Sequence, residues 1–163
     1  MAQGLLDLTR TPPQTAVEAG QRWANAYAQY ARAALSPAGG AVLSVEANQA
    51  ALAAALVPAF ANPLSPPPAT AVQLASAFTA FWLSPPVAFL AVPPAAPGLV
   101  TAVLGTAAFQ AGLISTWASN LASRAPNDVA MNNLAAVFDA FTRTVIVTHI
   151  LPPPAPPIVG PIT

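Results

Sequence analysis

Lysine and cysteine are both absent from this 163-residue chain, and charged side chains make up only 6% of it. The lack of cysteine excludes a disulfide framework, a thiolate metal site and a cysteine nucleophile. The lack of lysine excludes a phosphate-binding loop of the Walker type. The five basic residues are scattered arginines that form no basic run, so nucleic acid is not an expected partner.

Charge is missing altogether between Glu46 and Arg124, and the formal net charge of the chain is zero. Soluble domains carry about 25% charged residues on average, and a net charge near zero promotes association. We therefore expect much of the surface to be covered by other proteins or by lipid.

The chain offers little for catalysis or for metal binding. Its one histidine, His149, could act as a general base with Asp128 or Asp139, but no nucleophile motif accompanies it. We interpret it instead as a residue that is hydrogen-bonded to backbone or water. The five carboxylates are isolated from one another, and no two have the spacing of a helical ligand pair. We predict that the protein is not an enzyme, with no catalytic residue, metal, cofactor or small-molecule substrate.

Twenty prolines divide the chain into blocks. Apolar spacing and breakers predict five helices, over about 16–35, 45–57, 69–83, 99–123 and 127–143. Thr15 and Glu18 fit a capping box at the start of the first helix, and Glu18 can pair with Arg22. No internal repeat is evident. We expect an all-α fold: a helical bundle of about five helices, with proline-rich extended loops and an extended, β-branched and proline-rich C-terminal arm.

Three segments follow from this pattern: an N-terminal extended segment 1–14, a helical domain 15–143, and a strand-like, proline-rich docking arm 144–163. The arm has no charge after Arg143. Its β-branched run could add to the sheet edge of a neighbour, and its stiff prolines lose little entropy on docking. We predict partner-binding residues in the arm at Val145, Val147, Ile150, Leu151, Ile158 and Ile162.

A second candidate surface is an aromatic stripe at helical spacing, formed by Trp23, Tyr27 and Tyr30. Such a stripe is more often core or a partner-facing surface than a ligand platform, which would also need a pocket. We include these three residues among the predicted partner contacts.

The stretch 99–118 is free of charge for twenty residues, which is the length of a membrane span. Its small residues are typical of helix packing in membranes. It also contains Thr101, Thr106 and Gln110, and no cluster of basic residues flanks it. A small membrane-embedded helical protein that uses this helix is therefore the second interpretation, and a membrane is the less favoured partner.

Three stretches carry a resemblance to a known class of proteins: Ala16–Ala31 (AVEAGQRWANAYAQYA), Phe81–Phe89 (FWLSPPVAF) and Thr144–Pro157 (TVIVTHILPPPAPP). They resemble small Ala/Pro-rich proteins that are encoded among the virion genes of tailed bacteriophages. The resemblance implies a virion component of the capsid surface, neck, tail or baseplate, assembled in the host cytoplasm, and it carries over no site residues. We expect a non-enzymatic structural subunit of a large protein assembly that binds other copies of itself and other structural proteins.

Overall fold

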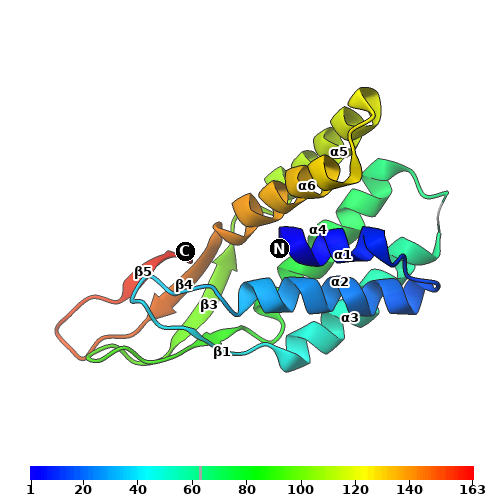
Figure 1. Cartoon of the computed structure of the whole chain (residues 1–163). Helices are drawn as coiled ribbons and strands as arrows, with labels where there is room; N and C mark the ends of the chain where they lie inside the picture. The colour runs from blue at the N-terminus through cyan, green and yellow to red at the C-terminus, as the bar shows by residue number, and fades with distance from the viewer. Residues whose placement is uncertain (63) are drawn as a thin grey trace.

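The computed structural model describes residues 1–62 and 64–163. Helices occupy one end of the molecule and an antiparallel sheet occupies the other (Figure 1). The helices are α1 (Ala2–Arg10), α2 (Ala16–Ala31), α3 (Glu46–Ala61), α4 (Pro67–Leu83), α5 (Thr106–Ser123) and α6 (Asn127–Thr142). The strands, in the order β1-β2-β3-β4-β5, are β1 (Val42–Ser44), β2 (Ala88–Phe89), β3 (Gly98–Val103), β4 (Val145–His149) and β5 (Ile158–Pro161).

The prediction of an all-α fold with five helices is wrong, because the described chain is mixed α/β with six helices and a five-stranded sheet. Part of the fourth predicted helix is strand β3, which is held by backbone pairing with β2 and β4. Helix α1 lies in the segment 1–14 that was expected to be extended. It has no side-chain cap, and it is held in place by burying Leu5 in the core. Both elements depend on distant partners, which local periodicity does not reveal.

Sequence signals correctly predicted features that depend on hydrogen bonds between residues close together in the chain. Oγ1 of Thr15 accepts the N–H of Glu18 at 3.1 Å, which confirms the predicted cap of α2. The Glu18 carboxylate pairs with Arg22 at 2.6 Å, also as predicted. It reaches back to the N–H of Gln14 rather than to that of Thr15. The second predicted helix was expected to end or kink near Val57 because of Pro58, but α3 continues through Pro58 to Ala61.

The structure reveals a unit that occurs three times along the chain. Each unit is a pair of helices followed by a β-hairpin: α1–α2 with the hairpin at 34–44, α3–α4 with β2–β3, and α5–α6 with β4–β5. The helices pack against one another in chain order, and α6 returns to α1, so that they form a closed ring. The second helix of each unit repeats one spacing of large apolar side chains: Trp23, Tyr27 and Tyr30; Leu74, Phe78 and Phe81; Leu134, Phe138 and Phe141.

The middle aromatic residue of each unit lies at the centre of the helical ring. The ring centroids of Tyr27 and Phe78 are 4.7 Å apart, those of Phe78 and Phe138 are 4.8 Å apart, and those of Tyr27 and Phe138 are 5.8 Å apart. All three side chains are fully buried. Two of the three pairs are edge-to-face, which is the arrangement that aromatic quadrupoles favour. This aromatic triad joins the three repeats in one core.

The two ends of the sheet are joined through the first hairpin. Leu35 and Thr163 exchange two backbone hydrogen bonds of 3.0 Å each, and Leu35 also bridges to Ala41. Because the N–H of Ile162 donates to β4, the nitrogen of the preceding Pro161 faces away from β4. Proline at this position therefore costs no hydrogen bond to β4, and the side of β5 that faces away from β4 lies against the first hairpin, where Leu35 pairs with Thr163.

We expect Phe138→Ala to lower the free energy of unfolding by about 3–5 kcal/mol, because it leaves a cavity where the three repeats meet. Phe60→Ala is the matched control, since this phenylalanine packs against the same core but is only partly buried. Urea denaturation followed by circular dichroism would measure both variants. Equal losses for the two would contradict a central role for the triad.

Candidate functional site

A chain of hydrogen bonds runs through the aromatic centre. Nε1 of Trp82 donates to the Tyr27 hydroxyl at 2.8 Å. The same hydroxyl oxygen lies 3.0 Å from Oγ1 of Thr142. The Thr142 hydroxyl donates to the carbonyl of Phe138 at 2.8 Å, so the Tyr27 hydroxyl is the donor toward Thr142. Burial raises the pKa of Tyr27 far above its ordinary value, which keeps the phenol neutral. Every group in the chain has a partner, so it holds the core together and leaves no group poised for proton transfer.

A second polar cluster lies where α2 and α6 end. The Tyr30 hydroxyl and the Arg143 guanidinium both donate to the Asp139 carboxylate, the latter at 2.8 Å. These hydrogen bonds, from Arg143 first and then Tyr30, lower the pKa of Asp139. Burial and the bond to Asp139 raise the pKa of Tyr30. The cluster borders a cavity of about 160 Å³ beside Ile162 and Thr163. Asp139 and Arg143 neutralise each other at this cavity.

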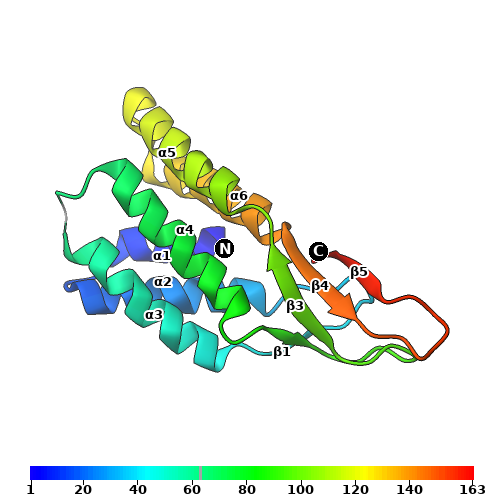
Figure 2. The same cartoon turned by 180° about the vertical axis from the view of Figure 1, so that it is seen from behind.

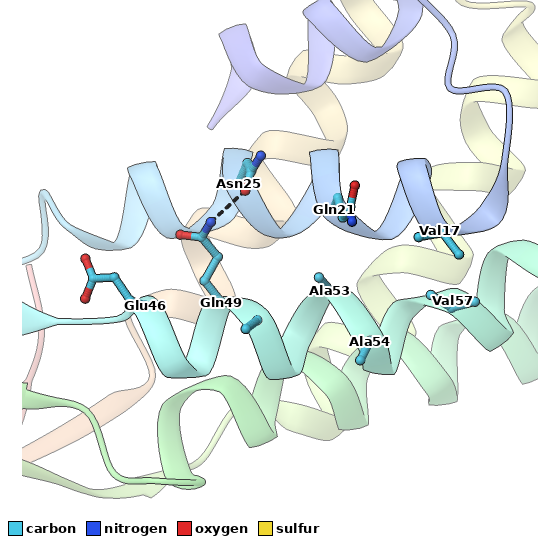
Figure 3. A pocket seen from close by; sticks show the side chains of 9 residues that line it. Val17, Gln21, Asn25, Glu46, Gln49, Ala53, Ala54 and Val57 are labelled. Carbon is cyan, nitrogen blue, oxygen red and sulfur yellow. Dashed lines mark hydrogen bonds between the residues drawn. The ribbon is translucent and has the colours of Figure 1, made fainter.

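A groove of about 460 Å³ lies between α2 and α3 (Figure 3). The two helices approach closely at Gly20, where a Cβ atom would lie 2.5 Å from the carbonyl oxygen of Ala53. One end of the groove is polar, and Nε2 of Gln49 donates there to Oδ1 of Asn25 at 2.6 Å. Hydrogen bonding, chiefly from Ser44, lowers the pKa of Glu46 at this end to about 2. The groove therefore offers amides, a stable carboxylate and an apolar floor, and no nucleophile.

His149 is fully buried in β4. Its Nδ1 lies 2.8 Å from the carbonyl oxygen of Ala96. The ring covers Gly98, where a Cβ atom would lie only 2.4 Å from Nε2, so only glycine fits there. Nε2 has no hydrogen-bond partner among the described residues. Among the described residues, neither Asp128 nor Asp139 forms a hydrogen bond with the His149 ring. The acid–base pair that was considered from the sequence is therefore not assembled.

The predicted arm residues divide into a buried and an accessible group. Val145, Val147 and Ile162 are buried in the core of their own chain. Ile150 is 69% exposed, and Leu151 and Ile158 are partly exposed. The accessible residues remain candidate partner contacts, whereas the buried ones hold the arm onto its own sheet.

The aromatic stripe lies mostly inside the molecule. Tyr27 is fully buried in the triad, and Trp23 and Tyr30 are partly buried against the core. Sequence reasoning missed Leu99 and Val159, which are 50% and 56% exposed on the outer face of the sheet. The alternating pattern of β3 was the available signal, but it was hidden when that stretch was assigned to a helix.

The sheet end of the molecule carries no formally charged side chain. We call residues 33–45, 84–105 and 144–163 the charge-free region, which contains all five strands and no Arg, Asp or Glu. Figure 2 shows β3, β4 and β5 side by side in it. One row of accessible residues crosses the outer face of every strand: Ser44, Ala88, Leu99, Thr148 and Val159. The charge-free region exposes further apolar side chains, at Leu35, Leu43, Leu90, Leu104 and Ile150.

No family model, curated protein or solved structure matches this chain.

The stretch 99–118 does not form one continuous helix, because β3 ends at Val103 and α5 begins at Thr106. Among the described residues, no helix has the length and apolar character that crossing a membrane requires. In the same part of the chain, no three His, Asp or Glu side chains gather closely enough to hold a metal ion.

We expect Tyr27→Phe to lower the free energy of unfolding by about 1–3 kcal/mol, because it leaves the buried N–H of Trp82 without an acceptor. A double-mutant cycle with Trp82→Phe tests the reason. The second change removes the orphaned donor, so the combined loss should be smaller than the sum of the single losses. Additive losses in urea denaturation would contradict the hydrogen bond.

Arg143→Gln should raise the pKa of Asp139 toward its ordinary value of 3.8, and Tyr30→Phe should do so to a smaller extent. The folded-state pKa is depressed, so this group stabilises the fold above its ordinary pKa. That stability is lost as pH falls through the lower, folded value. Both variants should therefore lose less stability on acidification. NMR titration of the carboxyl carbon gives the pKa, and an unchanged value in both variants would refute the assignment.

Proposed function

We propose that this chain is a non-enzymatic structural subunit of a large protein assembly, a component of a tailed-bacteriophage particle assembled in the host cytoplasm. The observation that carries the proposal is the charge-free region, which exposes apolar side chains without a charge to keep other proteins away. The phage setting rests on the resemblance of three stretches alone. Other copies of this chain and other structural proteins are the proposed partners.

The physical character of the region favours protein neighbours. Its outer row consists of aliphatic and small polar residues, which bind by excluding water rather than by ion pairing. Its long loops are rich in proline, so little conformational entropy is lost when they are covered. Because no charge takes part, association through this surface should be nearly independent of salt.

The C-terminal segment contributes to this surface as part of the sheet. β5 pairs with β4 along its length, and Ile162 is buried. Removing residues 150–163 would therefore damage the sheet and the core together. Point changes on the outer face separate binding from folding more cleanly.

We expect Leu99→Arg/Val159→Arg to abolish association while leaving the fold intact. An uncompensated charge buried in an interface costs about 3–5 kcal/mol. Val72→Arg/Val129→Arg is the matched control, because these valines are 46% and 43% exposed on the helical half. Sedimentation velocity over a range of protein concentrations, at low and high salt, would compare both variants with the wild type.

The proposal requires that wild type and control associate equally at both salt concentrations, and that the outer-face variant stays monomeric with an unchanged circular dichroism spectrum. Association that disappears at high salt, or that is the same in all three proteins, would contradict it. So would a wild type that stays monomeric throughout.

A further inference from the structure

Two loops at the far end of the sheet are the same structural element used twice. We call them the proline loops: residues 90–97, LAVPPAAP, and residues 150–157, ILPPPAPP. In the first, the N–H of Ala95 donates to the carbonyl of Val92 at 2.8 Å, and in the second the N–H of Ala155 donates to that of Pro152 at 3.2 Å. The flanking strands also pair in the same register.

The sheet does not need loops of this length to connect its strands. The hairpin of the first unit is closed by the short turn 36–40, in which the N–H of Ser36 donates to the carbonyl of Gly40 at 2.8 Å. The two proline loops extend beyond this and lie against each other, with the N–H of Ala96 donating to the carbonyl of Ile150 at 2.9 Å. Most of their residues are exposed. The extra length therefore builds a stiff surface rather than a connection.

The second proline loop is rich in hydrogen-bond acceptors and poor in donors. Within residues 152–157 only Ala155 has a backbone N–H, and that group is used inside the loop. Residues 152–157 offer carbonyl acceptors and apolar rings, and they offer neither free backbone donors nor charge. A complementary surface must supply hydrogen-bond donors on an uncharged, apolar base.

Away from the end that carries Glu46, the groove between α2 and α3 has these properties (Figure 3). Its apolar floor is formed by Val17, Val57 and alanines, and its polar part by the neutral side chains of Gln21, Asn25 and Gln49. Among the described residues, the amide nitrogens of Gln21 and Asn25 donate to no protein atom. The one acid at the groove, Glu46, pairs with Arg32 at 3.2 Å.

We propose that the proline loops of one copy bind in the α2/α3 groove of a second copy. The inference rests on the proposed function and deepens it by naming the partner and the contact. Loop carbonyls accept from the amides of Gln21 and Asn25, while the prolines pack on Val17 and Val57. The loops lie at the sheet end and the groove on the helical half of the same molecule (Figure 1). The contact is therefore head-to-tail, and it leaves a free loop end and a free groove for further copies in a chain or a ring. Leu99 and Val159 lie two residues beyond the ends of the two loops and belong to the loop side of this contact, so charges there disable it too.

The test uses two variants of the full chain that each disable one side of the contact. Ala54→Arg puts a charged side chain into the groove, and Ala96→Arg/Ala155→Arg puts charges on both proline loops. Each variant alone should associate at least about a hundredfold more weakly than the wild type. Mixed in equal amounts, they should form a discrete dimer and nothing larger, because one wild-type loop end and one wild-type groove remain. Ala51→Arg, at an exposed position of α3 outside the groove, is the matched control and should assemble normally.

Light scattering coupled to size-exclusion chromatography distinguishes the outcomes. If the wild type assembles but the mixture yields no dimer, the loop-in-groove contact is refuted while the proposed function stands. The groove would then be empty or hold a segment of another protein. If either variant alone assembles like the wild type, the contact is also refuted. A wild type that stays monomeric at every concentration overturns both the contact and the proposed function.

Discussion

The contact of Tyr27, Phe78 and Phe138 is the interaction on which the rest of the structure depends. Each ring comes from the second helix of a different repeat, and their centroids lie within 5.8 Å of one another. A ring of six helices built largely from alanine buries little apolar area at each pairwise contact, so it needs a common centre that is densely packed. The triad provides this centre, and the hairpins that follow the helices are brought together as one sheet because the helices are.

Equivalent positions in the three repeats carry different residues, which form different contacts. The position after the last residue of each apolar set (Tyr30, Phe81 and Phe141) is Ala31, Trp82 and Thr142 in turn, and the last two of these reach the hydroxyl of Tyr27. This hydrogen-bonded chain needs one tryptophan, one tyrosine and one threonine in a fixed order around the centre. Apolar packing alone would tolerate the repeats in other arrangements, whereas a buried polar chain left partly unpaired is costly. We infer that the polar chain specifies the arrangement that the aromatic triad stabilises.

Charge divides the molecule in two. Every formally charged side chain lies on the helical half or directly beside it, and the ion pairs there link neighbouring turns or helices at the surface. The sheet half has none, and its histidine, His149, is fully buried against Gly98. Exposed apolar residues on that half are therefore not interspersed with charge, which is the condition under which a surface associates with other proteins.

The sequence by itself determined the local features of the fold. Thr15 predicted the start of α2, and the helix now named α6 was predicted within a residue, because helical hydrogen bonds join residues four apart and leave a readable pattern. For the candidate surface, Ile150 was found from its apolar side chain, whereas Leu99 and Val159 were missed. Those two become neighbours only through Thr148, which pairs with both. The tertiary structure alone decided the sheet, helix α1 and the repeat, because their contacts join residues as distant as Leu35 and Thr163, and no local pattern encodes such a pairing.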